Sequence, residues 1–157
     1  MLARRTILTG LAAALLAGCQ TAVQTASPVA IGAIRVDTGP LAAKGQSATA
    51  AAIRPMLESE LASLRSAARH SATLHVTVTG LYLTSYAGGQ SATLGNDTLE
   101  SEAVLVGTDG RELARYPVMS IMAPSFSGAW YLPDINQRRI DALVANNAQW
   151  IRRALGR

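Results

Sequence analysis

The chain has 157 residues, of which 49% are hydrophobic and 4% aromatic, and it carries 14 basic against 10 acidic side chains. This length suits one domain with its own core. The net charge of +4 is small and forms no basic stripe, which argues against a nucleic-acid partner. The single cysteine excludes an internal disulfide, so the domain must be held together by its core.

The first 18 residues have the layout of an export signal. Arg4 and Arg5 precede an apolar run over 7–16, and the run leads directly into Ala17-Gly18-Cys19. A membrane span needs about 20 apolar residues, so this run is too short to cross a bilayer. The two small residues leave the backbone before the cysteine accessible to a peptidase.

Leu16-Ala17-Gly18-Cys19 resembles the lipobox of bacterial lipoprotein precursors. The resemblance implies that Cys19 receives a diacylglycerol, that the chain is cut before it, and that the new amine is acylated. It divides the chain into a signal peptide over 1–18, an acylated tether over 19–28 and one domain over 29–157. Gln20, where inner-membrane lipoproteins carry Asp, implies an outer-membrane anchor facing the periplasm. Two or three acyl chains hold a protein firmly, whereas one binds marginally.

The export route stays open at this point. Arg4-Arg5-Thr6-Ile7-Leu8 matches part of a twin-arginine signal, but no Ser or Thr precedes it and no Lys follows. An ordinary charged signal for unfolded export explains the same residues. Beyond the cysteine, residues 20–28 are small and mostly polar, which predicts a flexible tether between lipid and domain.

The domain is predicted to begin with a strand over 29–37, followed by a loop over 41–46. Apolar residues then recur at steps of three and four within 47–69, which predicts a helix. Pro55 would clash with the preceding turn of a longer helix. We therefore expect the helix to start at 50–54, with Pro55 in its first turn.

A second strand is predicted over 72–84, where apolar and polar residues alternate. Its Thr-rich face is expected to look toward solvent. The apolar phase shifts at Gly80, which indicates a β-bulge. Two further strands over 98–106 and 112–122 flank Asp109-Gly110, a strong hairpin signal.

Pro117 cannot donate to a strand ladder and therefore predicts an edge or bulge position for the last strand. A final helix is predicted over 135–155, with Asp134 as its N-cap and Gly156 as its C-terminal stop. Its apolar stripe comprises Ile140, Leu143, Val144, Asn147, Trp150, Ile151 and Leu155.

The element order β-α-β-β-β-α predicts an α/β (α+β) fold: a two-layer sandwich with a mainly antiparallel sheet and two helices on one face. The pattern loosely resembles small periplasmic lipoproteins. These include the lipopolysaccharide-assembly lipoprotein, the activators of penicillin-binding proteins and proteobacterial lipoprotein families of unknown function. That resemblance brings no motif of functional residues.

Catalytic and metal-binding patterns are weak, and we predict neither an enzyme nor a metal or other cofactor. The chain has two histidines, His70 and His75, whereas a metal site needs clustered ligands. No Gly-x-Ser-x-Gly string is present. Glu100 and Glu102 share one strand face and could serve a cell-wall hydrolase, although such exposed pairs usually protect a sheet from aggregation.

The segment over 123–133 is the best candidate for a function because it gathers Phe126, Trp130 and Tyr131 without a charge. One interpretation is that Trp130 and Leu132 cover the sheet edge and belong to the core. The other is a partner-binding patch, flanked by Arg138 and Arg139, since aromatic and arginine side chains anchor protein interfaces. We therefore predict a non-catalytic binding or assembly module. A component that handles lipid or lipopolysaccharide is an alternative, with Arg138, Arg139, Arg152 and Arg153 on anionic headgroups.

Overall fold

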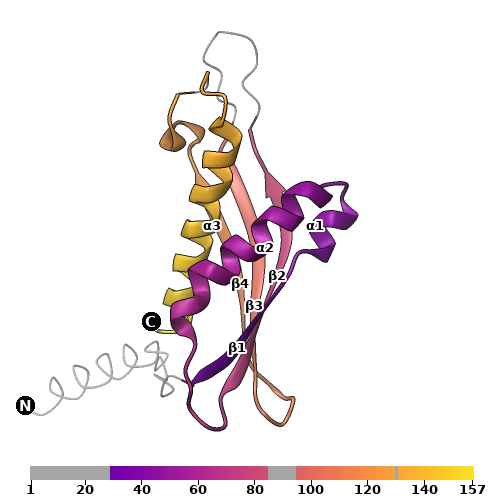
Figure 1. Cartoon of the computed structure of the whole chain (residues 1–157), viewed down its shortest axis with the longest axis vertical. Helices are drawn as coiled ribbons and strands as arrows, with labels where there is room; N and C mark the ends of the chain where they lie inside the picture. Colours follow the sequence, from indigo (N-terminus) through magenta and orange to yellow (C-terminus); the bar gives the residue numbers. More distant parts are fainter. Residues whose placement is uncertain (1–28, 85–94, 130) are drawn as a thin grey trace, which may run out of the picture.

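The computed structural model describes residues 29–84, 95–129 and 131–157, which form one sheet with helices on one of its faces (Figure 1). The lipobox, the tether and Trp130 lie outside these residues. The described elements are β1 (Ile31–Asp37), α1 (Gly39–Ala43), α2 (Ser47–Leu61), the 3-10 turn η2 (Ala62–Leu64), β2 (Ala72–Tyr82), β3 (Asp97–Val106), β4 (Glu112–Met122), the 3-10 turn η3 (Pro124–Ser127) and α3 (Ile135–Ala154).

The four strands lie in the order β1-β2-β3-β4. β1 runs parallel to β2, and α1 and α2 form the connection between them. The other two neighbouring pairs are antiparallel. The predicted two-layer α+β sandwich with a mainly antiparallel sheet is thus confirmed, with one more helix than the sequence predicted.

The core lies between the sheet and the helices α2 and α3. Along β2, Leu74, Val76 and Val78 are fully buried, whereas the residues between them are half-buried on the opposite face. This confirms the predicted alternation and its polar outer face. The helices contribute Ile53, Leu57 and Leu61 from α2 and Leu143, Val144, Ala148 and Ile151 from α3.

The prediction of a loop over 41–46 is wrong for residues 41–43, which belong to the short helix α1. Pro40 lies at its start, where a missing N–H costs nothing. The Asp37 carboxylate accepts a 2.8 Å hydrogen bond from the Gly39 N–H. Leu41 is fully buried, so tertiary contact at one side chain stabilises a turn too short to show a helical repeat.

The predicted boundaries of the next helix are also wrong. α2 begins at Ser47 and keeps Pro55 in its interior, because the packing of Ile53 and Leu57 outweighs the lost hydrogen bond. It ends at Leu61 instead of near residue 69. Beyond η2 the chain extends and the Ser66 N–H bonds the carbonyl of Ile31 at 2.7 Å, so pairing beside β1 replaces further helix.

The predicted bulge at Gly80 is confirmed by a register shift between Val78 and Gly80. The Lys44 ammonium, from the connection between α1 and α2, donates a 2.7 Å hydrogen bond to the carbonyl of Thr79 at this bulge. The chain's single lysine therefore satisfies a strand carbonyl where the regular ladder is interrupted.

The hairpin around Asp109-Gly110 is confirmed, with Gly110 at φ 79° and a 2.8 Å bond from the Gly107 N–H to the Arg111 carbonyl. Glycine adopts this left-handed conformation without strain. β4 is an edge strand, as Pro117 predicted.

The final helix follows the prediction to within one residue, and Gly156 at φ 73° ends it. Asp134 occupies the N-cap position but makes no capping hydrogen bond, since its carboxylate pairs with Arg138. Trp150, placed in the apolar stripe by its spacing, is 46% exposed. It lies beside Pro117 and Met119 of β4, and no further strand among the described residues extends the sheet beyond β4.

Within the described residues, no helix has the length and apolarity that crossing a membrane would require.

Candidate functional site

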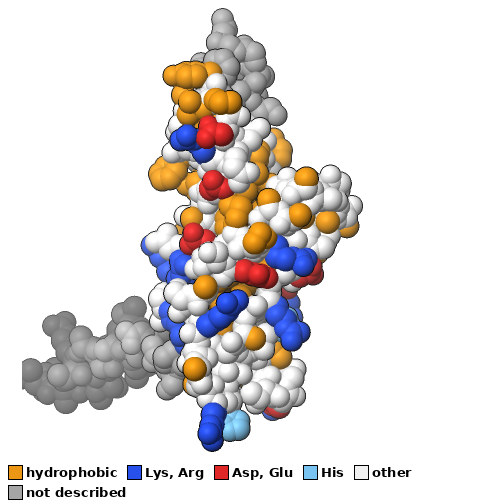
Figure 2. Space-filling model, viewed as in Figure 1, with side chains coloured by type: hydrophobic (Ala, Val, Ile, Leu, Met, Phe, Trp, Pro, Cys, Tyr) orange, Lys and Arg blue, Asp and Glu red, His pale blue; other side chains and the backbone are white. Residues whose placement is uncertain are grey.

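Two aromatic side chains stand out from one end of the domain. Phe126 is 74% exposed and Tyr131 is 71% exposed, the highest values among the exposed large hydrophobic residues of the described chain. We call these two residues the aromatic tip. They lie in the connection from β4 to α3, at the end of the molecule where Figure 2 shows hydrophobic side chains on the surface. Of the two interpretations of this segment, the exposure of Phe126 and Tyr131 is compatible with a partner-binding patch.

The backbone of this connection is shaped by proline and glycine. Ala123 is extended, as expected before Pro124, and Pro124 starts η3 with its side chain buried. Gly128 ends η3 at φ 111° and ψ −167°, a conformation open mainly to glycine. A Cβ atom at this position would also lie 3.2 Å from the Leu132 side chain. The tip is thus held in a defined path between β4 and α3.

A buried ion pair lies at the same end of the domain. Arg139 of α3 and Asp97 of β3 are 3% and 1% exposed and form a two-point contact through Nε and Nη2. Arg139 Nη2 also donates to the Thr84 carbonyl at 2.7 Å, and Asp97 accepts from the Thr84 N–H at 2.9 Å. These bonds join the end of β2, the start of β3 and the first turns of α3. We call the three residues the buried clamp.

The buried clamp corrects the prediction that Arg139 flanks a partner-binding surface. Its guanidinium is fully engaged inside the domain, with a further 3.0 Å bond to the side chain of Asn136. Arg138 is exposed as predicted, but it pairs with Asp134 over 2.8 Å. Spacing could have distinguished the two, because Arg139 lies four and eight residues before Leu143 and Asn147 on the buried helix face.

The other arginines of the lipid-handling alternative also have partners. Arg152 of α3 bonds the carbonyl of Glu60 and lies 3.5 Å from its carboxylate, which joins α3 to α2. The Arg153 guanidinium stacks 4.9 Å from the ring of Trp150. The four arginines therefore do not form one free cationic surface.

A second polar pair links sheet and helix in the core. The hydroxyl of Ser101 on β3 donates a 2.9 Å hydrogen bond to the side-chain oxygen of Asn147 on α3, and both residues are buried. Asn147 belongs to the apolar stripe by spacing, as predicted. A polar pair in this position restricts α3 to one register on the sheet, because any slip leaves both groups unpaired.

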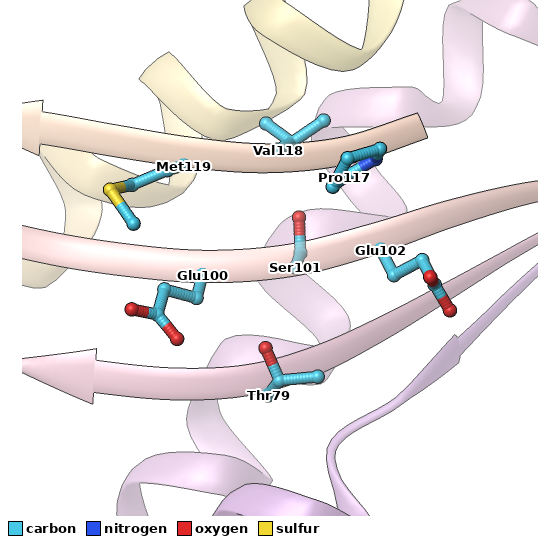
Figure 3. A pocket seen from close by; sticks show the side chains of 7 residues that line it. All are labelled: Thr79, Glu100, Ser101, Glu102, Pro117, Val118 and Met119. Carbon is cyan, nitrogen blue, oxygen red and sulfur yellow. The ribbon is translucent and has the colours of Figure 1, made fainter. Parts of the chain in front are cut away.

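The open face of the sheet holds a shallow depression of about 360 Å³ between β2, β3 and β4 (Figure 3). Glu100 and Glu102 project from β3 on this face, next to Thr79, Pro117 and Met119. The two carboxylates of the hydrolase alternative are thus brought to one surface. Glu102, however, forms an ion pair with Arg115 of β4.

Arg115 binds a second carboxylate, that of Glu112, over 2.6 Å. Hydrogen bonding from Arg115 lowers the pKa of Glu112 below its ordinary value, and the two carboxylates raise the pKa of Arg115. Both effects keep these side chains charged. Exposed charged side chains paired in this way are typical of a solvated surface.

The described residues contain no group of three or more His, Cys, Asp or Glu side chains that could hold a metal ion.

No protein-family model matches the chain, and no curated protein is significantly similar to it.

Proposed function

We propose that this protein is a lipid-anchored envelope lipoprotein, held in the outer membrane through Cys19, that presents a non-catalytic α+β domain to a periplasmic protein partner. The aromatic tip is the surface that contacts this partner. The observation that carries the proposal is the exposure of Phe126 and Tyr131 at the end of the domain away from residue 29, where the tether joins the domain.

The shape of the domain supports this arrangement. Val29 lies at the end where the C-terminus is, and its carbonyl accepts a 2.8 Å hydrogen bond from Arg157 (Figure 1). The aromatic tip follows β4 at the opposite end of the sheet. A strand rises about 3.3 Å per residue, so the 11 residues of β2 separate the two ends by roughly 35 Å. A domain tethered at Val29 can therefore hold its aromatic tip clear of the membrane.

The chemistry of the tip favours a protein partner. Phe and Tyr bring large rigid apolar surfaces that lose little conformational entropy on binding, and aromatic residues dominate interface hot spots. Two such side chains left in water gain from burial against another protein. The buried clamp at this end of the domain ties β2, β3 and α3 together, which limits the reorganisation that binding would cost.

The anchor is tested by a single substitution. We expect Cys19→Ser to abolish incorporation of labelled palmitate and to release the protein from the membrane fraction, because no other cysteine can carry the lipid. Gly18→Asp, which removes the small residue before the cysteine, should likewise block processing. Fractionation of Cys19→Ser with the membranes after a wash in about 1 M salt, which screens charge contacts, or a parent protein that never takes up palmitate, would reject the anchor.

The partner surface is tested by photocrosslinking in cells. A photoreactive amino acid at Phe126 or Tyr131 should trap a discrete envelope protein. The matched control is the same amino acid at Leu113, a half-exposed residue in β4 beside the hairpin turn at the other end of the sheet. Equal adducts from Leu113 and Phe126 would show unspecific contact, and the absence of any adduct from the tip would contradict the proposal.

A further inference from the structure

The end of the domain at which the described chain begins is built from four segments far apart in sequence. The Ala72 N–H bonds the Ala30 carbonyl and the Ser66 N–H bonds the Ile31 carbonyl, each over 2.7 Å. Thr73 pairs with Val106, which leads into the hairpin turn over 107–111. We call this surface the tether end: the start of β1, the connection over 65–71, the turn over 107–111 and the C-terminal residues.

The tether end is basic. It carries Arg65, Arg69, Arg111 and Arg157, against a single carboxylate among its described side chains, that of Asp109. The first three arginines are exposed, and no ion pair neutralises them within the described chain. The Arg157 guanidinium donates a hydrogen bond to the neutral carbonyl of Val29. Figure 2 shows basic and histidine side chains protruding at this lower end.

Charges farther from the tether end mostly pair within the protein. Glu60 pairs with Arg152, and Arg115 pairs with two carboxylates of the sheet. At the opposite end Arg138 pairs with Asp134. Elsewhere in the described chain, four cations form no ion pair, but four carboxylates form none either, so their charges balance: Arg35, Lys44, Arg54 and Arg153 against Asp37, Glu58, Glu100 and Asp141. Uncompensated positive charge is therefore concentrated where the tether enters the domain.

We propose that the tether end is a membrane-contacting surface, on which Arg65, Arg69 and Arg111 bind the phosphates of anionic lipid headgroups. This inference rests on the proposed lipid anchor, which brings the tether end next to the bilayer. Anionic membranes attract nearby arginines, and each one strengthens association by roughly fivefold. The contact orients the domain upright, with the aromatic tip directed away from the bilayer.

The orientation is tested on the acylated protein in vesicles of phosphatidylcholine with or without phosphatidylglycerol. Because lipid occupies Cys19, a new cysteine takes a fluorescent label specifically. Ala67→Cys places the label at the tether end, and Ser125→Cys places it at the opposite end. Both positions are exposed. Energy transfer to a headgroup-labelled lipid should be higher from position 67. The difference should shrink without phosphatidylglycerol and in about 1 M salt, where screening acts over roughly 3 Å.

A charge-reversal pair separates this surface from general electrostatics. Arg65→Glu/Arg69→Glu should remove the difference in energy transfer, whereas Arg35→Glu/Arg54→Glu, an equal change in net charge elsewhere, should preserve it. Equal energy transfer from both labels, or higher transfer from position 125, would overturn the proposal. A difference in transfer that stays the same without phosphatidylglycerol would also overturn it.

A second measurement does not depend on the anchor. In the full chain with Cys19→Ser, salt-sensitive co-sedimentation with phosphatidylglycerol vesicles should fall at least about 25-fold on adding Arg65→Glu/Arg69→Glu, at roughly fivefold per arginine. Co-sedimentation that Arg35→Glu/Arg54→Glu weakens equally would reject the surface. Failure of palmitate labelling would instead reject the anchor, and failure of tip crosslinking would reject the protein partner.

Discussion

Replacing Arg139 with Ala is expected to lower the free energy of unfolding by about 3–5 kcal/mol. The substitution leaves the Asp97 carboxylate, 1% exposed, without its cation, and it removes the donor from the Thr84 carbonyl. A buried charge without a partner cannot regain the hydration it lost on folding, so the loss exceeds that of an ordinary hydrogen bond. Urea unfolding followed by circular dichroism measures the difference.

Arg138→Ala is the matched control, one residue away on the same helix. Its ion pair with Asp134 is solvent-exposed, so we expect a loss of about 0–1 kcal/mol. The double variant Arg139→Met/Asp97→Leu should be more stable than Arg139→Ala, because it removes both buried charges together. Equal losses for Arg138→Ala and Arg139→Ala would contradict the buried clamp.

Leu143→Ala is expected to cost about 2–5 kcal/mol, as for other fully buried leucines. Leu143 has no exposed surface and packs between α3 and the sheet. Trp150→Ala, seven residues later on the same helix, should cost less than half as much although it removes a larger side chain. Trp150 is half-exposed, and its contact with Arg153 belongs to the exposed class worth roughly 0.5–1 kcal/mol.

The comparison of these two variants tests the position of α3 at the sheet edge. The same urea titrations give the free energy of unfolding of both variants when the curves are fitted with one shared slope of free energy against urea concentration. A loss for Trp150→Ala as large as that for Leu143→Ala would mean that the tryptophan is enclosed in the core. The apolar spacing of the sequence would then describe α3 better than the structure does.

The sheet was largely predictable because its signals are local. Alternation along 72–82 placed Leu74 and Val76 on one face, and Gly80 marked the bulge at which the register shifts. Asp109-Gly110 indicated the hairpin, since left-handed backbone at the turn favours glycine. Helix boundaries were less predictable, because Pro55 was tolerated where tertiary packing offset its local cost.

The candidate site was predictable only in part. A run without charge identified the region of Phe126 and Tyr131, and both side chains are exposed in the structure. Helix spacing could have placed Arg139, unlike Arg138, on the buried face of α3, but it could not have identified Asp97, 42 residues earlier in the chain, as the partner. A partner at that distance leaves no local pattern.

The amino-acid sequence by itself determined the strand faces, the hairpin, the bulge and the extent of α3. Each of these depends on the spacing of apolar residues or on a turn residue within a few positions. The sequence also carries the whole basis for expecting a lipid on Cys19. Tertiary structure alone decided that Arg139 pairs with Asp97, that Trp150 lies half-exposed beside β4, and that the segments carrying Arg65, Arg69 and Arg111 lie at the same end of the sheet as Val29. These features depend on which distant segments meet in space, and local patterns do not encode that.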